Sequence, residues 1–128
     1  MAVPMPEQTY NLRVRELFAH LTHAGSLTLA HDPLRFTVGA HEQGACAEFF
    51  VAHRENCIER VRYQAYGCPH FLAACEWLAG WLEGRAWSDL SVWDWREIER
   101  VLDVPANKRA RLLLLDDVIG QLRRLQPA

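Results

Sequence analysis

The sequence predicts an α+β fold, with a small antiparallel sheet in the middle of the chain and helices before and after it. Residues 44–66 alternate between apolar and polar side chains on both sides of a short break at Glu55-Asn56, which is the pattern of a β-hairpin. Apolar side chains recur at helical spacing on both sides of this hairpin. All of residues 1–128 are expected to form one domain, because a chain of this length can bury one ordinary hydrophobic core.

The elements predicted before the hairpin are one helix and two short strands. Leucine, valine and phenylalanine recur at near-helical spacing over residues 7–21, which predicts a helix that ends before Gly25-Ser26. Residues 27–30 and 34–38 favour strands, and the turn pair Asp32-Pro33 separates them.

The hairpin brings two distant cysteines to one end of the sheet. In an antiparallel pair the start of the first strand lies beside the end of the second, so Cys46 and Cys68 are expected to meet. Cys46 and Glu48 are two residues apart on a strand and should share a face. Pro69 suits the first turn of a helix, which places Cys68 at a helix N-terminus that favours a thiolate.

Three helices are predicted after the hairpin. The first begins at Pro69 and carries Cys75 in its apolar stripe, where we expect a buried thiol rather than a ligand. Ser91 is expected to cap a second, short helix. Asp103 is expected to cap the last helix, with Pro105 in its first turn. The buried stripe predicted for this helix consists of Leu112, Leu115, Ile119 and Leu122.

Several other distinctive side chains are expected to serve structure rather than ligand binding. Trp77, Trp81 and Trp87 should pack against the core, although aromatic side chains are also enriched in partner surfaces. His20 and His23, near the end of the first helix, should cap it or face solvent.

The composition argues against several classes of partner and function. A formal net charge of −2 gives no reason to expect nucleic acid or an anionic membrane, and no apolar run approaches the roughly 20 residues that span a bilayer. The first residues lack the features of an export signal, so the four cysteines are expected to be reduced thiols in the cytoplasm. No Ser-His-Asp order, phosphate loop or carboxylate pair indicates catalysis, and we expect no enzyme activity.

Three short motifs stand in a characteristic order along the chain. They are Cys46-Ala47-Glu48 at the start of a strand, Gly67-Cys68 at a strand-to-helix turn, and Pro105-Ala106-Asn107-Lys108 at the opening of the last helix. Together they resemble the IscU/NifU family of scaffolds for iron–sulfur cluster assembly, and the resemblance extends from Tyr10 to Leu122. It implies an IscU/SufE-like fold, in which helices pack on one face of a three-stranded antiparallel sheet.

The resemblance also implies a ligand set. Cys46, Glu48 and Cys68 would bind iron, a labile [2Fe–2S] cluster or zinc, all of which accept thiolate and carboxylate ligands. The candidates for a fourth ligand are His70, in the first turn after Cys68, and His41, in the loop before Cys46.

The chain departs from the family pattern at two places. Arg111 occupies the position of the family's third cysteine, which the resemblance identifies as a ligand and a main acceptor of sulfur; a guanidinium has no lone pair for a metal. By the family's arrangement Arg111 would face the thiol site, where it would offset the thiolates or pair with Glu48. Val104-Pro105-Ala106-Asn107-Lys108 stands where Leu-Pro-Pro-Val-Lys is usual, which alters the segment recognised by a dedicated chaperone.

Three functional interpretations follow, all within iron–sulfur cluster assembly. The first is a scaffold-like protein that binds iron, a labile cluster or zinc through a reduced ligand set. The second is a paralogue that binds no cluster and acts as an interaction module on a cysteine desulfurase or another assembly protein. The third is a SufE-like sulfur acceptor in which Cys68 or Cys46 carries a persulfide.

Overall fold

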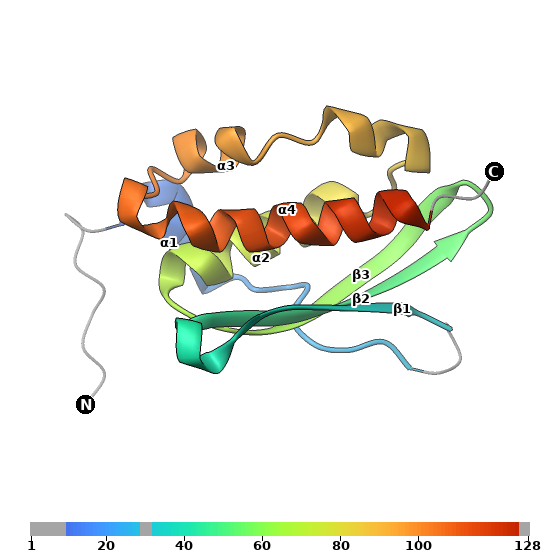
Figure 1. The fold of residues 1–128 in the computed structure, drawn as a ribbon, viewed down its shortest axis with the longest axis horizontal. Coiled ribbons are helices and arrows are strands. Elements are labelled where there is room, and N and C mark those ends of the chain that lie inside the picture. The colour runs from blue at the N-terminus through green and yellow to red at the C-terminus, as the bar shows by residue number, and fades with distance from the viewer. Residues whose placement is uncertain (1–9, 29–31, 126–128) are drawn as a thin grey trace.

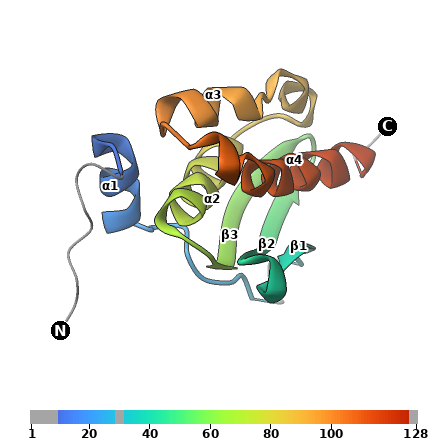
Figure 2. The ribbon, with the colours of Figure 1, turned by 60° about the vertical axis from the view of Figure 1, so that its left-hand side comes forward.

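The computed structural model describes residues 10–28 and 32–125. Three strands form one antiparallel sheet of order β1-β2-β3. Helices α2 and α4 lie over one face of this sheet, and α3 lies on their outer side (Figures 1 and 2). The predicted α+β fold class is confirmed. The elements are α1 (Leu12–Ala19), β1 (Leu34–Ala40), the 3-10 turn η2 (His41–Gln43), β2 (Ala45–Arg54), β3 (Cys57–Tyr66), α2 (Pro69–Leu82), η3 (Trp87–Val92), α3 (Trp95–Val101), η4 (Ala106–Lys108) and α4 (Arg109–Arg124).

The central hairpin forms where the alternating pattern predicts it. Arg54 pairs with Cys57 beside the two-residue turn, in which Glu55 adopts a left-handed φ of 56°. Phe49 is buried on the helix-covered face of β2 and lies 5.7 Å from the ring of Tyr63 on β3. Cys57 is exposed at this end of the hairpin, far along the strands from Cys46.

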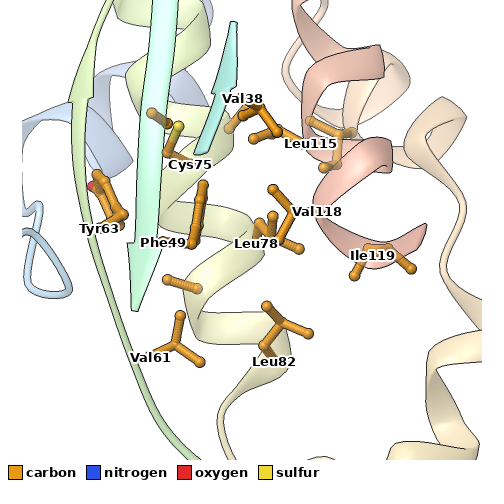
Figure 3. Packing of buried hydrophobic residues seen from close by; sticks show 14 of the residues in the cluster. Val38, Phe49, Val61, Tyr63, Cys75, Leu78, Leu82, Leu115, Val118 and Ile119 are labelled. Carbon is orange, nitrogen blue, oxygen red and sulfur yellow. The ribbon is translucent and has the colours of Figure 1, made fainter. Parts of the chain in front are cut away.

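The core lies between the sheet and the helices α2 and α4. Leu78 and Leu82 of α2, Val118 of α4 and Phe49 of β2 belong to one buried apolar cluster (Figure 3). Cys75 is fully buried in this layer, as expected from its position in the apolar stripe. The stripe predicted for the last helix, Leu112, Leu115, Ile119 and Leu122, is buried throughout.

The segment before the hairpin differs from the prediction in its boundaries. Helix α1 is shorter than residues 7–21, because Asn11 caps its start by accepting a hydrogen bond from the Val14 amide at 2.9 Å. Residues 27–28 belong to no strand, and residues 29–30 and 7–9 lie outside the described part of the chain. Strand β1 contains the predicted residues 34–38 and extends to Ala40.

The predicted starts of the last two helices are wrong. Ser91 lies within η3, and Asp94 caps α3 by accepting a hydrogen bond from the Arg96 amide at 3.0 Å. Asp103 ends α3 instead of starting α4: it has a φ of 50°, and the Val104 amide after it bonds to the Glu99 carbonyl at 3.0 Å. A left-handed residue followed by such a bond is the usual end of a helix.

The tryptophans pack as predicted, but one histidine does not behave as expected. Trp87 belongs to the core, and Trp77 and Trp81 pack against it while half-buried. His23, which was expected to cap the first helix or face solvent, contacts two carboxylates, Glu76 and Glu83. Within the described ranges, no helix is both long and apolar enough to cross a bilayer.

Candidate functional site

Cys68 lies where the beginnings of α2 and α4 meet. It directly precedes α2, and Pro69 occupies the first helical position. Gly67 permits the close turn out of β3, because a Cβ there would lie 2.7 Å from the ring of Phe71. Arg111, in the first turn of α4, donates a hydrogen bond from Nη1 to Cys68 Sγ at 3.2 Å. The structure therefore confirms that Arg111 faces the thiol.

Two sources of positive charge act on this sulfur. The N-terminus of α2 carries a partial positive charge, and the Arg111 guanidinium carries a full one; both stabilise negative charge on Sγ. The guanidinium also lies against the turn that leads into β2, since a Cβ at Gly44 would be 3.3 Å from Nη2. Arg111 thus connects Cys68 with the backbone just before Cys46.

A second cation lies in the same region. The Lys108 ammonium is 3.1 Å from Nδ1 of His70, a side chain that is only 1% exposed. Because an ammonium group can only donate, Nδ1 must accept, and the ring proton lies on Nε2. Burial, and next the charge of Lys108, lower the pKa of His70 to about 4, so the imidazole is neutral at physiological pH.

Tyr10, near the start of the described chain, lies beside His70 and Lys108. Its ring centroid lies 4.7 Å from that of His70 and 5.5 Å from Lys108 Nζ. Burial raises the pKa of the Tyr10 hydroxyl, the charge of Cys68 raises it further, and Arg111 lowers it. We call Tyr10, Cys68, His70, Lys108 and Arg111 the thiol cluster.

Cys46 and Glu48 lie on the other face of the sheet. Their neighbours Ala45, Ala47 and Phe49 are buried under the helices, and successive strand residues point to opposite faces. Glu48 accepts a hydrogen bond from Arg35 on β1 at 2.9 Å, so its carboxylate already has a partner.

A hollow of about 500 Å³ surrounds Cys46 on this face. Gly39 on β1, which pairs with Cys46, also lines the hollow. His41 borders the hollow and stacks on Tyr66 with ring centroids 4.7 Å apart.

The family model of the NifU-like N-terminal domain matches residues 9–121. The chain belongs to this family. A search of curated proteins found no match.

Solved structures share the fold of this NifU-like domain at low sequence identity. One is a nitrogen-fixing NifU-like protein (N-terminal) from Brucella abortus, which is 17% identical with a TM-score of 0.55; the alignment covers 63% of this chain and 55% of that one. Another is described as an iron–sulfur cluster assembly scaffold for the SUF system of Fervidobacterium islandicum AW-1, with 13% identity, a TM-score of 0.57, and coverage of 66% and 61%. A hypothetical protein is 19% identical, with a TM-score of 0.55 and coverage of 88% and 86%.

These similarities confirm the fold that the resemblance implied. The alignments span little more than half of the first two chains, 55% and 61% of their lengths. At identities of 13–19% they establish the fold alone.

The ligands expected of this NifU-like domain do not form one group. Cys46 and Glu48 border the open face, whereas Cys68 packs against the core and bonds to Arg111. His70 offers Nδ1 to Lys108, and its Nε2 is buried without a partner. Across residues 10–28 and 32–125, no three His, Cys, Asp or Glu side chains are arranged to hold a metal ion.

Cys46 and Cys68 nevertheless belong to the same end of the hairpin, because Cys46 pairs with Tyr66, two residues before Cys68. Burial raises the pKa of Cys75 well above its ordinary value, and the charges of Glu76, Cys46 and Cys68 raise it further. Cys75, which is also fully buried, is therefore inert in the folded protein.

Sequence reasoning missed the contact between Lys108 and His70. The two residues are 38 positions apart, and Lys108 was assigned to the chaperone segment. The available signal was that Lys108 is the only lysine in the chain and lies three residues before Arg111.

Proposed function

We propose that this NifU-like domain serves iron–sulfur cluster assembly as a sulfur acceptor, with Cys68 as the residue that carries the sulfur. Membership of the family supports the process. The observation that supports the residue is the 3.2 Å hydrogen bond from Arg111 to Cys68 Sγ, which places a permanent positive charge beside the sulfur instead of a third metal ligand. The partner that delivers sulfur would be a cysteine desulfurase.

The proposed step is a thiol–persulfide exchange. The Cys68 thiolate attacks the outer sulfur of a donor persulfide, R–S–SH, so that a new sulfur–sulfur bond forms at Cys68 and the donor's sulfur–sulfur bond breaks. The donor leaves as a thiolate, R–S⁻, and Cys68 becomes Cys–S–SH; no oxidant or reductant is needed. Because Cys68 must then pass the sulfur on, the domain is a carrier and not an enzyme.

This role requires a reducing compartment such as the cytoplasm. All four cysteines are free thiols in the structure. A persulfide carrier has to start each cycle as a thiol, which oxidising compartments do not maintain.

The test is persulfide loading from a purified cysteine desulfurase and L-cysteine, followed by peptide mass spectrometry. We expect added sulfur on Cys68 in the wild-type protein, none at that site in Cys68→Ala, and undiminished loading of Cys68 in Cys46→Ala and in the control Cys57→Ala. Loading confined to Cys46, or no loading in any variant, would contradict the proposal.

A second candidate function is the scaffold role, with iron, a labile [2Fe–2S] cluster or zinc held by Cys46, Glu48 and Cys68, and His70 as a fourth ligand. Its support is that Cys46 pairs with Tyr66, two residues before Cys68, so both thiols belong to the same end of the hairpin. Binding would require Glu48 to leave Arg35 and Cys68 to leave Arg111, because each is already engaged.

Anaerobic reconstitution with iron and sulfide, followed by metal analysis and absorption spectroscopy, tests the scaffold role. Bound metal should disappear in both Cys46→Ala and Cys68→Ala, and Arg111→Cys should increase its retention by restoring a third thiolate. If both alanine variants keep the metal, this ligand set is excluded. If Arg111→Cys changes nothing, the interaction-module interpretation is favoured.

A further inference from the structure

A small pocket of about 50 Å³ lies between α2 and the segment that joins η3 to α3. Trp77 and Trp81 are four residues apart on α2, so both indoles project from the same side of that helix. None of the lining residues belongs to the thiol cluster. The residues that line this pocket, which we call the tryptophan pocket, are Trp77, Trp81, Val92, Trp93, Asp94 and Glu97.

The indoles of Trp81 and Trp93 form a corner in the pocket. Their ring centroids lie 5.1 Å apart, and their planes are inclined by 66°. The chain's own guanidinium groups lie over single rings outside the pocket: Arg85 is 3.9 Å from the centroid of Trp81, and Arg13 is 5.5 Å from that of Trp77. A planar guanidinium stacks well on one ring, whereas a corner of two rings suits a compact, rounded cation that can contact both.

The rim of the pocket is acidic. Asp94 and Glu97 are the charged residues of its lining, and their side chains are 52% and 62% exposed. Their ion pairs are long: Arg96 lies 3.5 Å from Asp94 Oδ1, and Arg100 lies 4.0 Å from Glu97 Oε1. Because exposed pairs of this kind contribute little energy and exchange readily, both carboxylates remain able to attract a further cation.

The surface around the pocket extends beyond the space that one cationic group would fill. A second hollow of about 260 Å³ shares Trp77 and Trp81 with the pocket and reaches Leu17 of α1 and Gly80 of α2. Val92, at the pocket itself, is 69% exposed. A free amine would fill only the pocket, whereas a cation carried by a polypeptide would also cover the second hollow and Val92.

We propose that the tryptophan pocket is a docking site for a lysine side chain of a partner protein. The ammonium group lies against the indoles of Trp81 and Trp93, and the two carboxylates of the rim face it. Indole faces attract cations, and the attraction increases as the cation is withdrawn from water. Apolar residues that flank the lysine in the partner cover Val92 and the second hollow. This site is separate from the sulfur chemistry proposed for Cys68.

The docked lysine belongs to another protein and not to a second copy of this chain. Lys108 is the only lysine in the sequence. Its ammonium lies 3.1 Å from Nδ1 of the buried His70, and 5.5 Å from the ring of Tyr10. A copy of this chain would have to break these contacts before it could offer an ammonium group.

Two short peptides measure the preference of the pocket for a cation. Acetyl-Leu-Lys-Leu-amide presents a lysine between apolar side chains, and acetyl-Leu-Gln-Leu-amide presents a neutral side chain in its place. Each is titrated into the ¹⁵N-labelled protein while NMR follows the indole N–H signals of the five tryptophans, assigned with single Trp→Phe variants. We expect the lysine peptide to shift the signals of Trp81 and Trp93 and to bind about fivefold more tightly than the glutamine peptide.

Variants of the pocket identify the groups that bind the ammonium. Glu97→Gln removes a rim carboxylate and Trp93→Leu removes one aromatic wall, and each should weaken binding of the lysine peptide by about fivefold. Trp93→Phe keeps an aromatic face and should retain most of the affinity; if Trp93→Leu does not fold, Glu97→Gln and Trp93→Phe carry the test. The matched controls are Glu59→Gln, exposed on β3, and Trp95→Leu, outside the pocket lining; both should leave the affinity unchanged.

Three results would overturn the proposal. The first is equal affinity for the lysine and glutamine peptides, or no binding of the lysine peptide. The second is an unchanged affinity in Glu97→Gln. The third comes from n-butylamine, which carries the same ammonium group without a polypeptide: it should bind more weakly than the lysine peptide, and equal affinity would make the pocket a site for free amines and not for a protein partner.

Discussion

Arg111 makes the site around Cys68 better suited to binding an anion than to binding a metal ion. A guanidinium offers five N–H donors and no lone pair, so it can bind a thiolate or a sulfur anion but not a metal. The 3.2 Å contact with Cys68 uses one of those donors. A cysteine at this position would add a third thiolate to the region, whereas the arginine adds a counter-charge and competes for the thiolate already present.

His70 should make the folded protein sensitive to acid. Its folded-state pKa is about 4 against an ordinary value of 6.5, so between these values the unfolded chain binds more protons than the folded one. The contribution of His70 to the free energy of unfolding should therefore be fully retained above pH 6.5, decrease as the pH falls toward 4, and change no further below that. At about 1.4 kcal/mol per pKa unit, the total loss is about 3 kcal/mol.

Urea unfolding at a series of pH values measures this effect. His70→Gln should flatten the slope between pH 6.5 and 4, and the control His20→Gln, at an exposed histidine, should keep it. Equal slopes in wild type and His70→Gln would show that another group is responsible.

The face on which each site residue lies was predictable from the numbering of the strand. Cys46 and Glu48 were assigned to one face of the first hairpin strand, and because Phe49 is an odd number of residues from both, the strand period places it on the opposite face. What the sequence could not provide is which face the helices cover. The turn at Gly67 then brings Cys68 to the helix side, away from Glu48.

At the scale of elements, periodicity was a better guide than capping residues. The hairpin and the stripe of α4 follow from repeated patterns that many residues support. A cap depends on the conformation of one or two residues, and the sequence offers Ser91, Asp94 and Asp103 for this role. The backbone selects among them: Asp94 starts α3, and Asp103, with its φ of 50°, ends it.

Asp94 and Ser91 provide a matched test of the cap. Asp94→Ala should lower the free energy of unfolding by about 1 kcal/mol, because the Arg96 amide loses its acceptor. Ser91→Ala should have little effect, since the Ser91 hydroxyl bonds only locally, to the Ser88 carbonyl at 3.2 Å. Chemical denaturation measures the free energy of unfolding of both variants. A larger decrease in Ser91→Ala than in Asp94→Ala would support Ser91 as the cap, as the sequence predicted.

At the scale of the whole molecule, a buried carboxylate joins three parts of the chain. Glu76 on α2 is 5% exposed and accepts hydrogen bonds from the Tyr63 hydroxyl at 3.0 Å, the His23 amide at 3.0 Å and the Thr22 hydroxyl at 3.1 Å. Burial, followed by the charge of Glu76, raises the pKa of Tyr63 and keeps its hydroxyl protonated as a donor. Sequence patterns did not reveal this network because His23 and Glu76 are 53 residues apart.

Glu76→Gln should destabilise the fold although it preserves the shape of the side chain. In Glu76, both carboxylate oxygens accept hydrogen bonds. In the Gln variant one of them is replaced by an NH₂ group, which faces hydrogen-bond donors and cannot accept from them. This loss should cost about 2 kcal/mol. The matched control is Glu97→Gln, at an exposed position on α3. The midpoints of urea unfolding report both changes, and equal midpoints for the two variants would show that the network contributes little.

The guanidinium beside Cys68 has one further consequence. In a site made of thiolates and a carboxylate, the negative charge is balanced by protons or by a metal ion from solution, so the chemistry of the pocket depends on pH and on the supply of iron or zinc. Here the polypeptide brings its own permanent cation to within 3.2 Å of the sulfur, so that charge balance at this thiol is settled during folding, whatever ions the surrounding solution contains.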